Sequence, residues 1–359
     1  MKWFLLYMIL AQNIDPLVLE QKSLEAREIL KKESVSFKRA EKKENSRIVS
    51  RDILLALYSL VDNSIKVVRL EVMVPSSLKD TSFKFKVLTS GFNVERVAGK
   101  GITRLGFAVN DSIVLDSRHL HLENQRKSPR DLFYFPYSDI FQDEYFVKSE
   151  LAFYKNIVRE SQDELCLNGA KSKAYPQKLL CEVFPDQWLM TLGAIEQMDE
   201  GEFFANPKYS VNKFLAHFRN KENAFFYSVS QDGARGLTQF MNSKRYPTYN
   251  QTRKNCPGVG LIADFELATA NMKNSIKAAI CFADWNLSRL PESVKVMFLQ
   301  NPFVGGEAVA AAHNGGLGRA LNFLRGKRIP KETRNFIKKY NETWKILEEF
   351  KKYFEQERC

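Results

Sequence analysis

Residues 233–241 are Gly233-Ala-Arg-Gly-Leu-Thr-Gln-Phe-Met241, and this stretch decides the fold of the C-terminal half of the chain. Its two glycines predict a tight turn, because glycine adopts backbone conformations that side chains forbid. The small residues let the backbone approach a ligand closely, and Gln239 offers both a donor and an acceptor. We therefore predict a glycine-bearing turn that leads into a helix.

A carboxylate precedes this turn at helical spacing from an apolar face. Glu222 falls four residues beyond Phe218, the last of the apolar positions. An inward carboxylate is costly unless it is paired or has a chemical task, and desolvation raises the pKa of such a group so that it can donate a proton. A Glu that reaches solvent or pairs with Arg219 is an equally open interpretation. The apolar face consists of Val211, Phe214, Leu215 and Phe218.

Two further segments lie downstream. Residues 305–319 predict a helix of small residues that ends in a glycine turn, with His313 and Asn314 where the helix breaks. The glycine spacing fits neither a dinucleotide-binding loop nor a P-loop. Pro330 and Glu332 then predict the start of a C-terminal helix. Its apolar stripe consists of Ile337, Tyr340, Trp344, Leu347 and Phe354.

Taken in order, four blocks resemble the soluble lytic transglycosylase family. They are Glu222, Gly233–Gln239, Ala311-Ala-His-Asn-Gly-Gly316 and Glu332-Thr-Arg-Asn-Phe-Ile337, within residues 206–345. The family pattern is a catalytic Glu, then Gly-Ala-x-Gly-Leu-Met-Gln, Ala-Tyr-Asn-Ala-Gly and Glu-Thr-x-x-Tyr-Val. The resemblance implies a helical domain of the goose-type lysozyme fold.

The chain departs from the family pattern at four points. The distance from Glu222 to the glycine block is one residue shorter than the family's. Asn223 stands where Ser is common, Thr238 replaces Met, and His313 replaces Tyr. The imidazole of His313 can still form a hydrogen bond, although its protonation depends on its surroundings.

The resemblance implies cleavage of the β-1,4 bond between N-acetylmuramic acid and N-acetylglucosamine in peptidoglycan. Glu222 would protonate the glycosidic oxygen and then accept the proton of the muramoyl 6-hydroxyl, which closes a 1,6-anhydro ring. Gln239 and Asn314 would orient the substrate. The other substrate-binding candidates are His313, Thr238, Ser230, Phe240 and Tyr340, of which the last three fit a turn or the core equally well. The activity requires no metal and no organic cofactor.

Ordinary glycosidases need a second carboxylate. Asp232, Asp264 and Glu266 are the candidates here, and none of them lies in a block that the family uses for this role. The sequence therefore favours the transglycosylase over a goose-type lysozyme that hydrolyses the same bond. A catalytically inactive peptidoglycan-binding or scaffold protein is a further alternative, which the changes at Thr238 and His313 suggest.

Composition limits the partners. The chain has 359 residues, 44% of them hydrophobic, and 54 Lys+Arg against 42 Asp+Glu give a formal net charge of +12. This excludes a wholly disordered chain and predicts attraction to polyanions. We expect peptidoglycan glycan strands as the partner, with other cell-envelope proteins as candidates for the N-terminal region. Nucleic acid is not expected, because no recognition motif is present.

The N-terminus and the cysteines predict export to the periplasm or cell envelope of a bacterium. Residues 1–11, with an apolar stretch from Trp3 to Ala11, fit a short signal peptide, and a buried terminal segment is the alternative. Oxidising conditions would permit Cys166 to pair with Cys181 and Cys256 with Cys281, although spacing alone leaves the connectivity open.

The domain prediction follows from these segments. Residues 12–51 are a charged helix or linker, and residues 52–143 form a mixed or β-rich domain, with strands expected at 64–74, 82–88 and 112–115. Residues 144–205 are a helical connector, and residues 206–359 form the lysozyme-like domain. The predicted class is α+β, with a mainly α-helical C-terminal domain.

Overall fold

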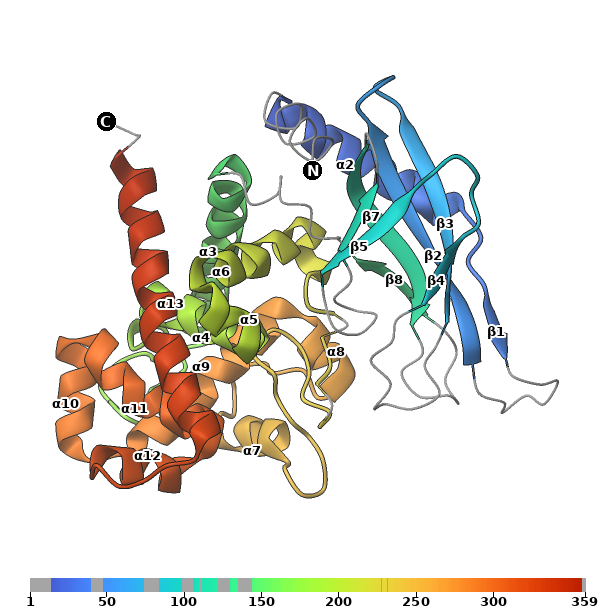
Figure 1. Ribbon diagram of the computed structural model, residues 1–359. Coiled ribbons are helices and arrows are strands. Elements are labelled where there is room, and N and C mark those ends of the chain that lie inside the picture. The colour runs from blue at the N-terminus through green and yellow to red at the C-terminus, as the bar shows by residue number, and fades with distance from the viewer. Residues whose placement is uncertain are drawn as a thin grey trace. The chain divides into compact units, whose positions relative to one another are not determined.

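The protein divides into two compact units, Met1–Phe146 and Val147–Cys359 (Figure 1). A computed structural model describes residues 14–39, 48–73, 84–98, 106–109, 112–121, 130–134, 144–226, 228–230 and 232–356. Strands predominate among the described residues of the first unit and helices among those of the second, which confirms the mixed class and the predicted order of strands before helices.

In its described residues the first unit contains one helix and an eight-stranded antiparallel sheet. The sheet order is β4-β3-β2-β7-β6-β5, while β1 pairs with β2 and β8 pairs with β7. The elements are α2 (Pro16–Lys32), β1 (Phe37–Arg39), β2 (Ile48–Ser59), β3 (Ile65–Met73), β4 (Phe85–Val87), β5 (Val94–Ala98), β6 (Gly106–Val109), β7 (Ser112–His121) and β8 (Arg130–Tyr134).

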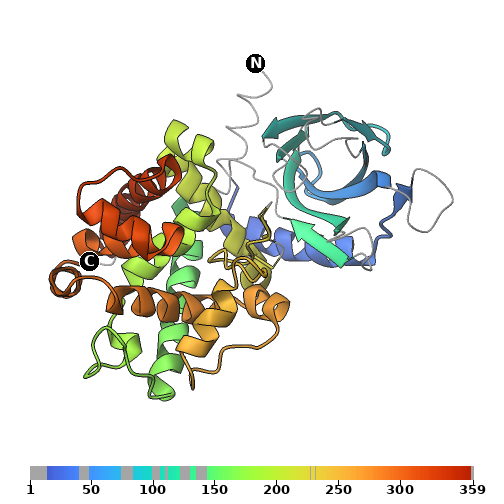
Figure 2. The same ribbon diagram turned by 90° about the horizontal axis from the view of Figure 1, so that it is seen from below.

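Strand β2 is covered on both faces over residues 53–58, which explains why these residues form an unbroken apolar run rather than an alternating pattern. Alternate residues Ile53, Leu55 and Leu57 share a hydrophobic core with side chains of β3, β5, β6 and β7. Leu54 and Ala56, which point to the opposite face, are also fully buried. Helix α2 lies against β2 and β7 beside the curved sheet (Figure 2).

Two arginines attach α2 to β7. Arg118 of β7 donates to the carbonyl oxygens of Leu30 at 2.7 Å and Lys31 at 3.0 Å, which belong to the last turn of the helix. The last carbonyls of a helix lack the regular intrahelical partner, and a cation near them also complements the helix dipole. Arg27 of α2 forms an ion pair with the buried Asp116 of β7.

The named elements of the second unit are all helices in the part of the chain that the structure describes. Its elements are α3 (Glu144–Leu167), η3 (Leu180–Glu182), α4 (Asp186–Gln197), α5 (Glu200–Ala205), α6 (Pro207–Ala216), η4 (His217–Asn223), α7 (Thr248–Asn255), α8 (Phe265–Ala270), α9 (Met272–Ser288), α10 (Glu292–Gln300), α11 (Pro302–Gly315), α12 (Leu317–Leu324) and α13 (Lys331–Gln356). Helix α13 starts directly after Pro330, as predicted, and Gly316 ends α11 with a φ of 79°.

Helix α4 is the centre of this unit. All eight residues Trp188–Ile195 are buried, and the helix is in contact with α6, α9, α11 and α13 (Figure 1). A helix that is covered on every side belongs to the core rather than to the surface. One hydrophobic core extends from Val147 to Phe350, so residues 147–205 pack together with residues 206–350.

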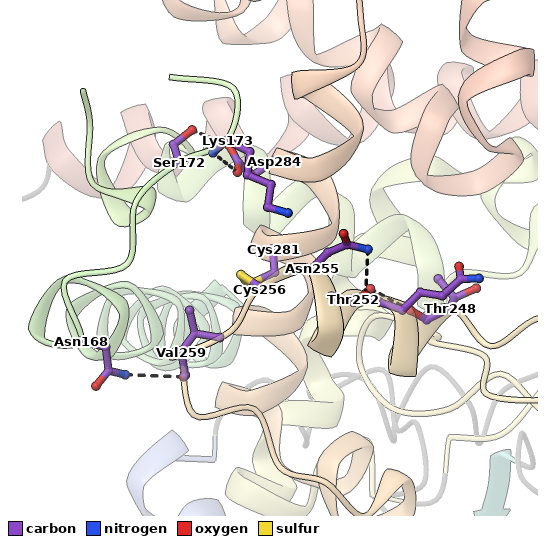
Figure 3. The surroundings of a disulfide bond; sticks show 11 residues. Asn168, Ser172, Lys173, Thr248, Thr252, Asn255, Cys256, Val259, Cys281 and Asp284 are labelled. Carbon is purple, nitrogen blue, oxygen red and sulfur yellow. Dashed lines mark hydrogen bonds between the residues drawn. A yellow bond between two sulfur atoms is a disulfide. The ribbon is translucent and has the colours of Figure 1, made fainter. Parts of the chain in front are cut away.

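Two disulfide bonds cross-link the second unit. Cys166 at the end of α3 is joined to Cys181 in η3, and Cys256 after α7 is joined to Cys281 in α9 (Figure 3). These are the two pairings considered from the sequence, where spacing left the connectivity open, and they indicate an exported protein. None of the helices in the described part of the chain is long and apolar enough to cross a membrane.

Candidate functional site

The glycine block forms a closed turn. The backbone amides of Arg235 and Phe240 each donate to the carbonyl of the other, at 2.9 Å and 3.1 Å. Gly236 and Gln239 inside this turn have φ values of 73° and 48°. Such angles do not continue into a right-handed helix, so the predicted helix does not follow directly, and the next one begins only at Thr248.

Position 236 requires a glycine because of its positive φ and also because a side chain would have no room there. A Cβ atom built on it would lie 3.0 Å from the carbonyl carbon of Thr269 and closer still to the carbonyl oxygen. Its amide donates to the carbonyl of Ser228 at 2.9 Å. The turn therefore lies tightly against the end of α8, which only a glycine permits.

Gln197, at the C-terminus of α4, holds the turn from the other side. Its amide nitrogen donates to the carbonyls of Gly236 and Leu237, both at 2.8 Å. Its amide oxygen accepts from the hydroxyl of Ser228 at 2.8 Å. One side chain thus fixes two successive peptide groups and a neighbouring serine relative to the central helix.

The predicted residues of the glycine block have different environments. Gln239 is half-buried and donates to the Ser228 hydroxyl at 3.0 Å and to the Gly236 carbonyl at 2.8 Å. Thr238 is buried and donates to the carbonyl of Ser275 at 3.2 Å, which anchors the turn to α9. Ser230 is exposed and accepts from the amide of Ala234 at 3.0 Å. Ser230 and Thr238 therefore stabilise the turn itself.

His313, in the last turn of α11, faces α4. Its Nε2 atom lies 3.3 Å from a carboxylate oxygen of Glu196, and the two side chains are 6% and 15% exposed. The imidazole packs edge-on against Phe282 and Phe240, with ring centroids 5.2 Å and 6.2 Å away. Among the described residues no group hydrogen-bonds to the buried Nδ1 atom of His313.

The remaining two blocks meet beside His313. Asn314 accepts a hydrogen bond from the buried hydroxyl of Thr333 at 3.1 Å, which joins the end of α11 to the start of α13. Tyr340 is fully buried and donates to the carbonyls of Pro302 and Phe303 at 3.1 Å and 3.2 Å. Burial raises the pKa of Tyr340. The structure thus places Tyr340 in the core, where it fastens α13 to α11, and not in a cleft.

The structure changes the argument for Glu222. Helix α6 ends at Ala216 and continues as the 3-10 helix η4, in which Lys221 has a φ of 49° and a ψ of −129°. The α-helical spacing that aligned Glu222 with Phe218 therefore does not hold. Arg219 lies 3.8 Å from Glu150, and both side chains are almost fully buried. The side chain of Glu222 lies outside the part of the structure that is described.

The three acids considered as second carboxylates are not brought together. Asp232 is exposed in the turn before Gly233. Asp264 is the N-cap of α8 and accepts from the amide of Leu267 at 2.9 Å. Glu266 follows in the first turn of the same helix. Asp264 therefore has a structural role at a helix terminus.

Sequence reasoning missed Glu196 and Gln197. A signal was present, because these two polar residues directly follow Trp188–Ile195, an uncharged run that becomes the buried central helix.

Comparison with known proteins identifies no relative: no family model, no curated protein and no solved structure gives a significant match to the chain.

Proposed function

We propose that this protein is a peptidoglycan lytic transglycosylase of the bacterial periplasm or cell envelope. It would cleave the bond between N-acetylmuramic acid and N-acetylglucosamine and leave a 1,6-anhydro end. The proposal combines the resemblance of the sequence blocks with the way in which the described residues gather around the end of α4.

One observation carries the proposal. Three blocks that are far apart in the sequence meet in the second unit: the glycine turn, the end of α11 and the start of α13. His313 of α11 packs against Phe240 of the glycine turn, and Asn314 bonds to Thr333 of α13. A chain that had kept these blocks for unrelated reasons would not be expected to place them side by side.

The backbone of the turn supports a binding role. Gln239 and Lys221 are two of the three non-glycine residues with positive φ in the described part of the chain, and the third, Asn63, lies in the hairpin between β2 and β3. Strained non-glycine conformations of this kind persist where the surrounding structure enforces them, and they are frequent at ligand-binding sites. The half-buried amide of Gln239 is thus held in a fixed orientation, which suits an N-acetyl or hydroxyl group of a sugar.

The two disulfides and the basic composition are consistent with this location. Disulfides persist in oxidising compartments outside the cytosol. A formal net charge of +12 favours binding to peptidoglycan, which carries peptide carboxylates.

The test is digestion of purified peptidoglycan by the full chain, with half of each reaction treated with borohydride before mass spectrometry. Anhydro ends have no free reducing group and keep their mass, whereas the reducing ends left by hydrolysis gain hydrogen. Anhydro products are the expected result. Borohydride-sensitive products would mean a hydrolase of the goose-type lysozyme kind. Binding to peptidoglycan without any release would mean a scaffold protein.

A further inference from the structure

We propose that Glu196, at the C-terminus of the central helix α4, is the carboxylate that protonates the glycosidic oxygen, in place of Glu222. This inference rests on the proposed function and deepens it, because it assigns the acid of the reaction to a residue that lies outside the resembling blocks.

The first argument is convergence on one helical turn. Residues Ile195–Met198 at the end of α4 are contacted from the glycine turn, from α11 and from α13. Gln197 binds the glycine turn, and Glu196 contacts His313 of α11. Lys339 of α13, two residues beyond the last block, donates to the carbonyls of both Ile195 and Met198. These elements therefore surround the end of α4, and Glu196 is the acid at that position.

The second argument is the environment of the carboxylate. Glu196 is 15% exposed, so it is mostly removed from water and still reaches the surface. A general acid must lie in a sheltered position and still be within reach of the substrate. Among the described residues His313 is the one group within ion-pair distance of Glu196, and it contacts one of the two carboxylate oxygens.

The third argument concerns the neighbouring acids, which already have structural roles. Asp199 caps α5 through the amides of Gly201 and Glu202. Glu202 accepts two hydrogen bonds from the buried Lys213, at 2.7 Å and 2.8 Å. Glu200 is exposed and accepts from Asn335. Of the four acids between residues 196 and 202, Glu196 is the one that contacts a motif residue from a largely buried position, since Glu200, which bonds to Asn335 of the last block, is exposed.

In this proposal the imidazole of His313 orients the carboxylate of Glu196. With its Nε2 atom 3.3 Å from one oxygen of Glu196, the imidazole restricts the rotamers of the carboxylate by direct contact. Phe240 and Phe282 hold the ring in place by edge-on packing. The replacement of the family's Tyr by His is therefore compatible with activity, provided that the carboxylate it contacts is the reacting one.

The proposed step is balanced and needs no co-reactant. The Glu196 carboxyl group gives its proton to the glycosidic oxygen, and the bond from this oxygen to the anomeric carbon breaks, so the leaving N-acetylglucosamine keeps a 4-hydroxyl group. The muramoyl 6-oxygen bonds to the anomeric carbon and releases its proton to the Glu196 carboxylate. The enzyme returns to its starting protonation state.

The experiment compares the full-length wild type with Glu196→Gln, Glu222→Gln and, as a matched surface control four residues away from Glu196, Glu200→Gln. Initial rates of anhydro-muropeptide release are measured on purified peptidoglycan. Gln at position 196 keeps the side-chain volume and an oxygen for His313 but cannot donate a proton from that oxygen. We expect Glu196→Gln to lose at least ~100-fold in rate, the usual contribution of general acid catalysis. Glu222→Gln and Glu200→Gln should stay within about threefold of the wild type.

The outcomes separate the two proposals. Release by the wild type that is lost in Glu222→Gln and retained in Glu196→Gln would overturn the assignment of Glu196 and leave the function intact. Absence of release by the wild type would overturn the function and this inference with it. Melting curves check folding. If Glu196→Gln proves unfolded, Glu222→Gln decides, because an inactive, folded Glu222→Gln refutes the assignment.

Discussion

Gly236→Ala probes the contact that shapes the site. Two independent features make this position intolerant of a side chain. Its φ of 73° lies in the left-handed region, and a Cβ would approach the carbonyl group of Thr269 at the end of α8. A matched variant, Gly233→Ala, isolates the effect of the backbone conformation. Gly233 has a φ of 85°, but a Cβ added there would meet nothing within 4 Å.

The expected magnitudes differ accordingly. A non-glycine residue in the left-handed region costs about 1–2 kcal/mol, and the reduced entropy of the unfolded chain offsets about 0.4–1 kcal/mol of this. Gly233→Ala should therefore lower the free energy of unfolding by about 1 kcal/mol. Gly236→Ala has the same backbone cost and, in addition, an overpacking cost of about 1–3 kcal/mol. We therefore expect it to lower the free energy of unfolding by about 2–4 kcal/mol in total.

Urea denaturation followed by tryptophan fluorescence measures this difference in the second unit, which contains Trp188, Trp285 and Trp344. The midpoint of Gly236→Ala should fall well below that of Gly233→Ala at an unchanged slope. Equal midpoints for the two variants would refute the claim that the turn is pressed against Thr269. In that case the positive φ alone would explain both glycines.

Three further predictions concern the scaffold around the site. Removing the second disulfide with Cys256→Ala and Cys281→Ala should lower the free energy of unfolding by about 3–4 kcal/mol in urea, because the bond closes a loop of 25 residues; an unchanged midpoint would contradict this. Gln197→Ala should cost about 1–3 kcal/mol and speed amide hydrogen exchange in residues 232–240, since three hydrogen bonds are lost; wild-type protection there would contradict it. Burial raises the pKa of Asp284, so the folded state binds its proton more readily than the unfolded state, and the stability that this adds is lost as the pH rises from about 4 towards neutrality. The free energy of unfolding of the wild type relative to Asp284→Asn should therefore be larger at about pH 4 than at about pH 7. The opposite trend in urea denaturation would refute the raised pKa of Asp284.

The local sequence pattern was sufficient to predict several strands and the C-terminal helix. The strands β3, β4 and β7 occur where runs of Val, Ile and Phe between turn residues predict them. Helix α13 starts after Pro330 because proline fits the residue before or at a helix start, and its apolar stripe is set by the helical period. The two disulfide pairs were among those that the sequence allows, and the structure selects them.

The surroundings of the glycine block could not be predicted in the same way. Periodicity treats residues 211–222 as one helix, but the helix ends at Ala216 and Lys221 takes a left-handed φ. A break of this kind depends on tertiary packing, which local spacing does not report. The contact between Glu196 and His313 joins residues 117 positions apart, so only the fold brings them together.

Blocks that resemble a family directed attention to Glu222 because it precedes the glycine turn at nearly the family's spacing. The structure adds a criterion that spacing lacks, namely which carboxylate the other blocks surround. Glu196 meets that criterion through Gln197, His313 and Lys339, which connect the same helical turn to three elements.

The most direct test of the central claim is peptidoglycan digestion by the wild-type chain in water enriched in oxygen-18, with products identified by mass spectrometry. A transglycosylase closes the anhydro ring without consuming water, so we predict anhydro-muropeptides that lack one water molecule and carry no heavy oxygen. New products with a reducing end, heavier than the anhydro form by one water molecule, would contradict the account, because a water molecule would then have attacked the anomeric carbon.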